Sequence, residues 1–363
     1  MPESRPWNLH AMKALLRKIL SPHHIFTIKS YILSLKLLIY RFFGSQRWLS
    51  RLYYGLFSSE FGRECQSVLQ GKIRYHESHR SYDMGNSALL RRNVHRLEKG
   101  LIMQPRKPSF AANYIEETVR AYEGMCSSSE FCGEERSWAH DVLNAYFNVV
   151  KDTPPIKRAR ETFQRIESLE LKAYIPYSHS DKTKTDISTE QLHNLFLQRR
   201  STRWFKPDNV EQEKVDKAIE LASLAPSACN RQPFSFYVAQ DQKDAVEIAK
   251  MAGGTGGFAE NIPVLIAVVG DLSAYPFERD RHLIYIDGSL AAMQLMLAFE
   301  TLGLSTCPIN WPDVEVREKQ IINKLKLQCD QRVIMLIAVG YGDGDGMIPF
   351  SSKKTVSSLK VDV

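Results

Sequence analysis

The chain has 363 residues, 44% hydrophobic and 25% charged, a composition typical of a globular protein with room for two domains. Its net charge of +7 is concentrated at one end, because residues 1–59 hold nine lysines and arginines against one acid, a net +8. The remaining residues therefore carry a net −1. A charge placed in this way does not indicate a nucleic-acid-binding protein, and no nucleic-acid-binding motif accompanies it.

The cysteines are scattered, with no Cys-x-x-Cys pair: Cys65, Cys126, Cys132, Cys229, Cys307 and Cys329. This spacing argues against a zinc site and against a disulfide framework, so we expect no bound metal and a reducing, cytoplasmic location. We expect no secretory signal, because Lys13, Arg17 and Lys18 break the apolar run after Met12. Nor do we expect a membrane-spanning helix, because the charged residues Lys29, Lys36 and Arg41 interrupt the most apolar window.

Residues 1–60 are predicted to form a basic amphipathic helical arm, since apolar residues recur at helical spacing from Ile32 to Phe42. Aromatic residues lie among its cations. Such an arm can lie on an anionic membrane surface, which would make residues 1–59 a peripheral membrane contact. The alternative, which we favour from the sequence, is that the apolar residues are core positions of a helical domain.

Residues 61–185 are predicted to be a helical N-terminal domain. After residues 82–87, a charged helix would begin with Asn86 or Ser87 as its N-cap and end at Gly100. Four of its basic residues share one face: Arg92, His95, Arg96 and Lys99. That face could meet a phosphate, but an exposed, solvated face is the commoner outcome and the one we favour.

Further helices are predicted over residues 113–150, interrupted by a loop at 127–133, and over residues 156–173 after the break at Pro154 and Pro155. The polar, turn-rich segment at residues 177–189 predicts the boundary to a domain of residues 186–363.

In that last domain helices alternate with strands. A helix capped by Ser188 and Thr189 should end at residue 199. The other helices are predicted at 210–224, 241–251, 280–302 and 315–325, and the strands at 234–239, 263–270, 303–312 (with a loop) and 332–339. The helix over 280–302 is apolar nearly all round, which indicates a deep core or a dimer interface, and we favour the dimer.

Residues 199–205, here called the arginine segment, combine three arginines with a serine and a threonine. Arginine presents a planar fork of donors that suits a phosphate, although the segment taken alone is typical of a charged helix end. A Pro/Asn loop at residues 225–233 and two lysines, Lys353 and Lys354, lie elsewhere in the same domain. Together these features favour an anionic cofactor whose own ring performs redox chemistry.

Other chemistries find no support in the motifs. A dinucleotide fingerprint, a P-loop and a Gly-x-Ser-x-Gly elbow are all missing from the sequence. His193 and His282 have no metal-like spacing and are interpreted as structural, and Cys307 as a small buried residue at a strand end.

Residues 191–363 resemble the nitroreductase family of flavin-dependent oxidoreductases. The resemblance rests on Arg-Arg-Ser-Thr-Arg-Trp-Phe at 199–205, Ala-Pro-Ser-Ala-Cys-Asn-Arg-Gln-Pro-Phe at 225–234, the long apolar helix, Thr-Cys-Pro-Ile-Asn at 306–310 and the two lysines near the end. It implies an α+β fold, with a mixed sheet flanked by helices and a mainly helical N-terminal domain outside the family core. It also implies a homodimer with bound FMN at the interface.

The resemblance assigns roles to individual residues. Arg199, Arg200 and Ser201 would contact the phosphate and ribityl chain, and Arg203 the pyrimidine edge of the flavin. A loop from the second subunit would reach the flavin through Pro226, Ser227, Ala228, Asn230 and Gln232. Pro308, Ile309 and Asn310 would bring a backbone amide to the reactive flavin nitrogen, and Lys353 and Lys354 would contact the phosphate.

The implied function is a two-step transfer of electrons from NADH or NADPH, through FMN, to a small-molecule organic acceptor that the sequence does not identify. No catalytic side chain is required by that scheme. The alternative is a membrane-surface or partner-binding protein that retains the fold with little or no turnover. Nucleic-acid binding is a third hypothesis, and we do not expect it.

Overall fold

The computed structural model describes residues 22–81, 87–127 and 133–363, and the chain divides into two compact units, Met1–Arg63 and Glu64–Val363. Residues 1–21 of the predicted arm, the Asn86 cap and most of the loop predicted at 127–133 lie outside the described residues. The boundary predicted near residue 185 stays a prediction.

Unit 1 is helical over its described part, as the sequence predicts. It comprises α2 (Pro22–Gly44), α3 (Arg47–Leu52) and a π-helix (Tyr53–Phe57). Within that part Leu49 is the one buried residue. Within the described part of this unit, taken by itself, the apolar residues of α2 are exposed, so they do not form the core that we favoured from the sequence.

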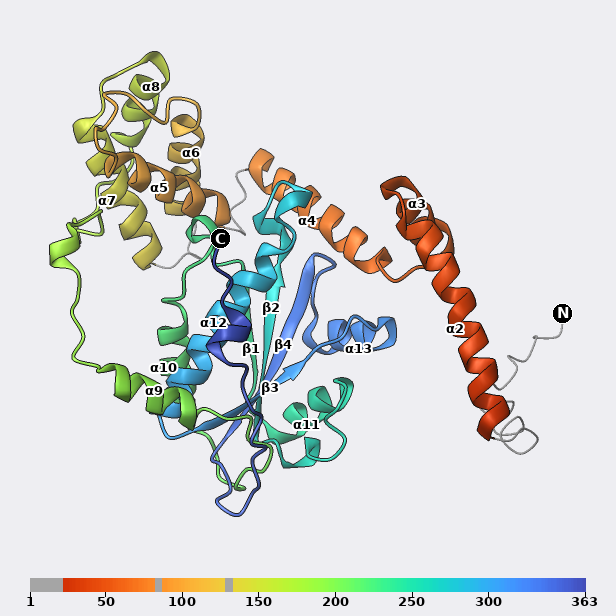
Figure 1. The fold of residues 1–363 in the computed structure, drawn as a ribbon. Coiled ribbons are helices and arrows are strands. Elements are labelled where there is room, and N and C mark those ends of the chain that lie inside the picture. Colours follow the sequence, from red (N-terminus) through yellow and green to blue (C-terminus); the bar gives the residue numbers. More distant parts are fainter. Residues whose placement is uncertain (1–21, 82–86, 128–132) are drawn as a thin grey trace. The chain divides into compact units, whose positions relative to one another are not determined.

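Unit 2 begins with a run of helices (Figure 1). They are α4 (Gly62–Ser81, which starts in unit 1), α5 (Ala88–Leu101), α6 (Ile115–Cys126), α7 (Gly133–Val149) and α8 (Pro154–Phe163). Helices α5 to α8 enclose a cluster of fully buried side chains that includes Leu90, Val94, Tyr122 and Tyr146. Pro154 occupies the first turn of α8, where its missing N–H costs nothing.

The helix predicted to stop at Gly100 continues to Leu101, and its C-cap is right-handed. Gly100 has a different role, because a Cβ atom there would lie 2.2 Å from Cε2 of Phe110. The glycine thus allows the close approach of an aromatic ring and does not terminate the helix.

The helix predicted over residues 156–173 ends at Phe163. Further along, buried Asp141 of α7 holds the non-helical chain in place, since its Oδ2 accepts hydrogen bonds from the backbone N–H groups of Lys172 (3.0 Å) and Tyr174 (2.8 Å). Donors committed to a carboxylate in this way cannot extend a helical ladder.

The rest of unit 2 is built on a four-stranded sheet in the order β1-β2-β4-β3, with every strand pair antiparallel. The strands are β1 (Phe234–Ala239), β2 (Val264–Asp271), β3 (Ser305–Asn310) and β4 (Gln331–Gly340). A parallel bridge joins Ser201 to Thr306 at the β3 edge. The predicted α+β class, a sheet flanked by helices with a helical N-terminal region, is confirmed.

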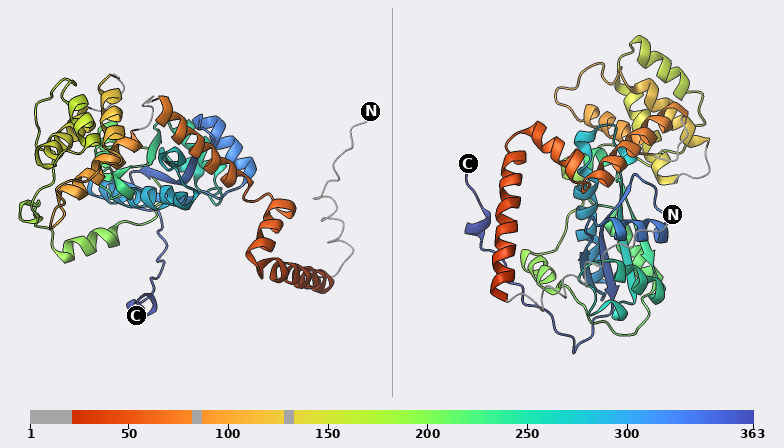
Figure 2. Two further views of the ribbon diagram at one scale, coloured as in Figure 1. Left: turned by 90° about the horizontal axis from the view of Figure 1, so that it is seen from above. Right: turned by 90° about the vertical axis from the view of Figure 1, so that its right-hand side faces the viewer.

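Helices cover both faces of this sheet (Figures 1 and 2). On one face, α10 (Gln212–Ala222) and α12 (Leu283–Thr301) pack against β2 and β4, and on the other, α11 (Gln242–Met251) and α13 (Glu315–Leu325) do so. Helix α9 (Thr189–Gln198) precedes the arginine segment, and the short α14 (Val356–Leu359) lies in the C-terminal segment.

Helix α12 has two different sides. Its Ala292, Leu295 and Phe299 are buried against the sheet and α10, whereas Ile286, Leu290 and Met293 are exposed at spacings of four and three. Among the described residues, Glu278–Thr301 is the one helical stretch long and apolar enough to span a membrane, but half of its most apolar window is buried, as in a core helix.

Candidate functional site

The arginine segment begins where α9 ends. Ser188 and Gln191 form the predicted capping box at the N-terminus of α9, and at its C-terminus Arg199 turns extended (φ −64°, ψ 108°). The chain then runs beside β3, with the Thr202 N–H donating to the Thr306 carbonyl at 3.0 Å. This pairing fixes the backbone of the segment, so its side chains project from a rigid edge.

The side chains of this segment line a cavity of about 340 Å³, together with residues of α9 and of the C-terminal segment. Its lining comprises His193, Phe196, Leu197, Arg199, Arg200, Ser201, Arg203, Ile348, Pro349, Ser351 and Lys353. Of the fourteen residues that the resemblance assigns to a cofactor, the structure thus brings together five: Arg199, Arg200, Ser201, Arg203 and Lys353. Four of these five are cations.

Arg200 connects the arginine segment to the C-terminal segment. Its Nη2 donates to the carbonyl of Pro349 at 2.6 Å and to the carbonyl of Phe350. Beyond these carbonyls Ser351 adopts a left-handed conformation (φ 49°), and Lys353 lies at the cavity. Lys354 is exposed and is not among the lining residues.

Arg203 lines the same cavity and packs against an aromatic ring. Its guanidinium carbon lies 5.7 Å from the centre of the Phe258 ring, and its Nη1 donates to the Ser201 carbonyl at 3.4 Å. Two residues on, the backbone of Phe205 is held at both its polar atoms by the side-chain amide of Asn261. The position of Arg203 is therefore set by packing as well as by charge.

A buried carboxylate lies beside the arginine segment. Glu300 of α12 is 7% exposed, and its Oε2 accepts a hydrogen bond from Nε2 of Gln198 at 3.3 Å. Burial raises the pKa of Glu300 to about 6, although the charge of Arg199 opposes that rise. Cys307 is also buried, as predicted, and burial raises the pKa of its thiol. It lies inside β3, however, and not at the strand end that the sequence predicts.

The loop at residues 226–232 lies outside this cavity's lining. It holds three non-glycine residues in left-handed conformations, Cys229 (φ 55°), Asn230 (φ 53°) and Gln232 (φ 49°). Buried Asp287 of α12 holds the loop from one side by accepting from the Ala228 N–H at 2.9 Å. Burial raises the pKa of Asp287, which also accepts from the Tyr275 hydroxyl.

Inside the loop, the Ser227 hydroxyl accepts from the Gln232 N–H at 3.0 Å. Pro226 and Ala228 complete the predicted set here. The predicted Pro308, Ile309 and Asn310 lie in β3, an edge strand, where a proline is tolerated. Ile309 is buried and Asn310 exposed, and none of the three lines the cavity. In a single chain the predicted site residues therefore fall into separate groups.

Sequence reasoning missed several residues of this region. His193, interpreted as structural, lines the cavity with Phe196 and Leu197. The spacing of Phe196 and Leu197 (three and four residues from His193) places all three on one face of α9, a signal present in the sequence. Glu300 and Asp287 gave no such signal, because they are isolated acids thirteen residues apart in the otherwise apolar helix α12.

The chain is similar to known proteins over its C-terminal part. Residues 196–341 match the model of the Nitroreductase family. Human iodotyrosine deiodinase 1 is 22% identical, over 63% of this chain and 87% of that protein, and the iodotyrosine deiodinase of Thermotoga neapolitana is 26% identical, over 42% and 90%. A protein of Archaeoglobus fulgidus provisionally named NADH dehydrogenase/NAD(P)H nitroreductase is 28% identical, over 42% and 86%.

Among solved structures, an FMN-dependent nitroreductase from Clostridium difficile is 27% identical in sequence. It aligns over 46% of this chain and 98% of its own, with a TM-score of 0.40.

Proposed function

We propose, on the basis of the match of residues 196–341 to the Nitroreductase family model, that the protein is an FMN-dependent oxidoreductase that uses NADH or NADPH to reduce a small organic acceptor. One observation carries the proposal. Around a single cavity the fold gathers Arg199, Arg200, Arg203 and Lys353 with the Ser201 hydroxyl, from segments about 150 residues apart.

The donor set suits FMN. Its phosphate is a dianion, and guanidinium, ammonium and hydroxyl groups are the side chains that bind phosphate in proteins. A cavity of about 340 Å³ is of the size that binds small ligands. Phe196 and Leu197 add apolar surface beside the charges.

Arg199, Arg200, Ser201 and Lys353 would hold the phosphate end, and Arg203 would place a positive charge near the ring. When bound, FMN would supply the hydride and electron transfer, so that no side chain of the protein needs to act as a nucleophile. A cation fixed near the ring favours its anionic reduced form. Arg200 would also order the C-terminal segment beside the ligand through its bonds to the Pro349 and Phe350 carbonyls.

A homodimer belongs to the same proposal. The apolar stripe of α12 (Ile286, Leu290 and Met293) is exposed in one chain, and a second copy would cover it. Dimerisation would also account for the separation between the arginine cavity and the 226–232 loop, if the loop of one chain serves the cavity of the other.

FMN binding tests the proposal directly. We expect the full chain to bind FMN and to show flavin absorbance that is bleached by NADH or NADPH. K353A should weaken binding by about tenfold, since it removes one charged contact, whereas K354A should have a smaller effect because Lys354 does not line the cavity. A protein that stays colourless in excess FMN would overturn the proposal.

The relatives suggest which acceptors to test. The match to the human iodotyrosine deiodinase spans 63% of this chain, beyond the residues covered by the family model. We therefore propose iodotyrosine as one acceptor class and a nitroaromatic compound as the other. Anaerobic reoxidation of the reduced protein, with iodide release or loss of the nitro group as readout, would separate the two.

A second candidate function is binding to an anionic membrane surface by unit 1, and the exposure of α2 favours it. Seven exposed apolar residues share one face of this helix: Ile28, Tyr31, Ile32, Leu35, Leu38, Ile39 and Phe42. No charge interrupts that face, and α2 holds Lys29, Lys36 and Arg41 without any acid. Apolar burial together with attraction to anionic lipid is the combination that holds an interfacial helix.

Neighbouring positions of α2 provide a matched test. We expect the full chain to sediment with vesicles of phosphatidylcholine and phosphatidylserine but not with phosphatidylcholine alone. L35E should abolish binding, while S34E adds the same charge outside the apolar face and should only reduce it. Equal binding by both variants, or none by the wild type, would refute this function. Binding would also favour a cytoplasmic location on the inner membrane surface, as we propose.

A further inference from the structure

Helix α5 of the N-terminal helical part contacts the loop at residues 226–232 through one side chain. Nε of Arg91 donates to the carbonyl of Asn230 at 2.8 Å, and Nη2 donates to Oε1 of Gln232 at 2.9 Å. Both loop residues have positive φ. A single guanidinium therefore spans the strained part of the loop with two charge-assisted bonds.

The loop needs such support because its conformation is costly. Three of the four residues from Cys229 to Gln232 are left-handed without being glycine, and L-residues with a side chain avoid this region. The loop's own hydrogen bonds, including Asn230 N–H to the Ser227 carbonyl at 3.0 Å, leave the Asn230 carbonyl for an outside donor. Arg91 is that donor.

Arg91 is itself fixed by the helical part of unit 2. Its side chain is 15% exposed, with Nη1 3.4 Å from Oε1 of Glu135 and its guanidinium carbon 5.4 Å from the centre of the Trp138 ring. Both partners belong to α7, and Nε1 of Trp138 donates to Glu98 of α5. The contacts with α7 therefore hold the Arg91 side chain in one rotamer, so that it loses little conformational entropy when it binds the loop.

The loop end of the contact is equally constrained. The Gln232 amide accepts from Arg91 at Oε1 and donates from Nε2 to the Ser223 carbonyl at 2.6 Å, at the end of α10. This side chain thereby joins α5 to α10 across the loop.

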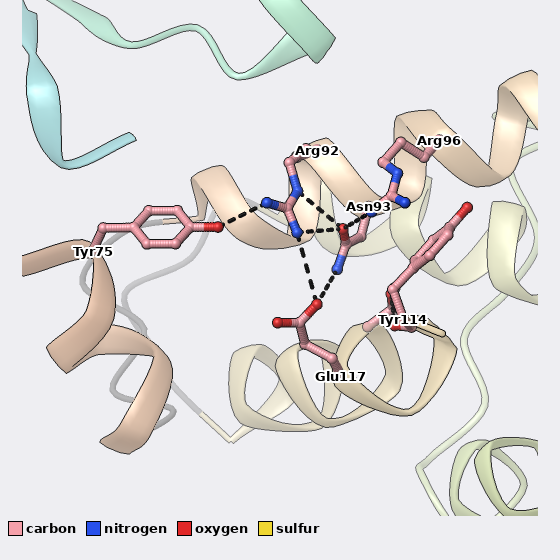
Figure 3. A network of polar contacts seen from close by, with 7 residues as sticks. Tyr75, Arg92, Asn93, Arg96, Tyr114 and Glu117 are labelled. Carbon is pink, nitrogen blue, oxygen red and sulfur yellow. Dashed lines mark hydrogen bonds and ion pairs between the residues drawn. The ribbon is translucent and has the colours of Figure 1, made fainter. Parts of the chain in front are cut away.

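The neighbouring arginines of α5 have a different task (Figure 3). Arg92 bonds to the Tyr75 hydroxyl and to Asn93 and lies 3.7 Å from Glu117, while Arg96 stacks 3.6 Å from the centre of the Tyr114 ring. The side chains of Arg92 and Arg96 are therefore bound within the protein, and they form neither the solvated face nor the phosphate-binding face that the sequence suggested. They tie helices of the N-terminal part together, and they provide a natural comparison for Arg91.

We propose that Arg91 is a positioning residue, through which the N-terminal helical part presets the 226–232 loop for the cofactor. The inference rests on the proposed function, in which this loop contacts FMN. It gives the helices outside the family domain a role in the flavin site, because their packing fixes the donor that shapes the loop.

The test compares three variants of the full chain with the wild type, by FMN affinity and by hydrogen exchange of the loop amides. R91A should weaken FMN binding by about 10- to 100-fold, the factor for losing hydrogen bonds to a charged group, and should speed exchange at Asn230 and Gln232. R91K, which keeps one donor, should fall between R91A and the wild type. R92A should leave FMN affinity within about twofold even where it lowers the unfolding temperature.

A rescue experiment separates loop geometry from direct contact with the ligand. Glycine adopts positive φ freely, so adding C229G to R91A should recover part of the lost affinity. No recovery would overturn the positioning role, as would faster loop exchange in R91A with unchanged FMN affinity. If the wild type does not bind FMN at all, the proposed function fails first, and that result is recognised before any variant is made.

Discussion

Glu300 is a residue whose ionisation opposes folding. It lies buried on α12 beside the arginine segment, and burial raises its pKa from 4.5 to about 6. When the pKa of a carboxyl group is higher in the folded than in the unfolded state, the folded state is at no disadvantage below the unfolded pKa, because the group is protonated in both states. The free energy of unfolding therefore falls as the pH rises from 4.5 through about 6, because above that range the folded state must carry the buried charge of Glu300.

E300Q should therefore stabilise the protein in a pH-dependent way. Above about pH 7 we expect its free energy of unfolding to exceed that of the wild type by about 2 kcal/mol, which corresponds to the pKa difference. Below about pH 4.5 the two should converge. Urea unfolding at several pH values measures the gap. A gap independent of pH would attribute the effect to the Gln198 hydrogen bond instead of to ionisation.

At this scale the sequence predicts what is local. The Ser188 cap and the arginine segment were identifiable because their partners lie within a few residues. Glu300 and Asp287 were not, since their partners Gln198 and Ala228 are 102 and 59 residues away. The role of Arg91 was not predictable either, because its partner Asn230 is 139 residues away. The helical spacing pointed to the basic residues from Arg92 to Lys99 instead.

At the scale of elements, α4 docks on the end of the sheet through a glycine and an ion pair. A Cβ atom on Gly71 would lie 2.7 Å from the carbonyl carbon and from Cβ of Leu272. One turn further, Nη1 of Arg74 bonds to both oxygens of buried Asp330, at 2.7 and 2.9 Å. Glycine here permits an approach of backbone to backbone that any side chain would prevent.

G71A should therefore destabilise unit 2, against the helix propensity that favours alanine. We expect a loss of about 1–3 kcal/mol, the usual effect of overpacking, because the backbone of Leu272 cannot move aside as a flexible side chain would. G133A is the control, since nothing lies within 4 Å of the corresponding Cβ atom in α7. It should be neutral or slightly stabilising. Equal unfolding temperatures for the two variants would refute the docking argument.

Element existence was predictable from periodicity, and element ends were not. The strands and most of the helices of residues 186–363 lie close to their predicted positions, because buried apolar runs and caps are properties of the local sequence. Asp141 binds the non-helical chain that follows α8, and Gly100 of α5 lies against the ring of Phe110. Both are tertiary contacts, which a local pattern does not contain.

At the scale of the whole molecule, the candidate flavin site is divided within one chain. The cavity of the arginine segment includes no residue of the 226–232 loop, although the resemblance assigns both to one cofactor. Sequence reasoning could place both parts in a site through the family but could not derive their separation, which depends on the path of the sheet between them. A second copy of the chain is the simplest way to reunite the two parts.

L290E tests that requirement. Leu290 is 44% exposed in the apolar stripe of α12, and a charge there would be buried without a partner if the stripe forms the dimer interface. We expect the wild type to be a dimer by light scattering, and L290E to be a monomer with FMN affinity reduced at least tenfold. L171E, at a leucine that is 57% exposed and lies far along the chain from α12, makes the same chemical change and should stay dimeric.

If L290E remains a dimer, the interface lies elsewhere. If it becomes a monomer that binds FMN as tightly as the wild type, the cavity of one chain suffices, and the 226–232 loop does not act across the interface.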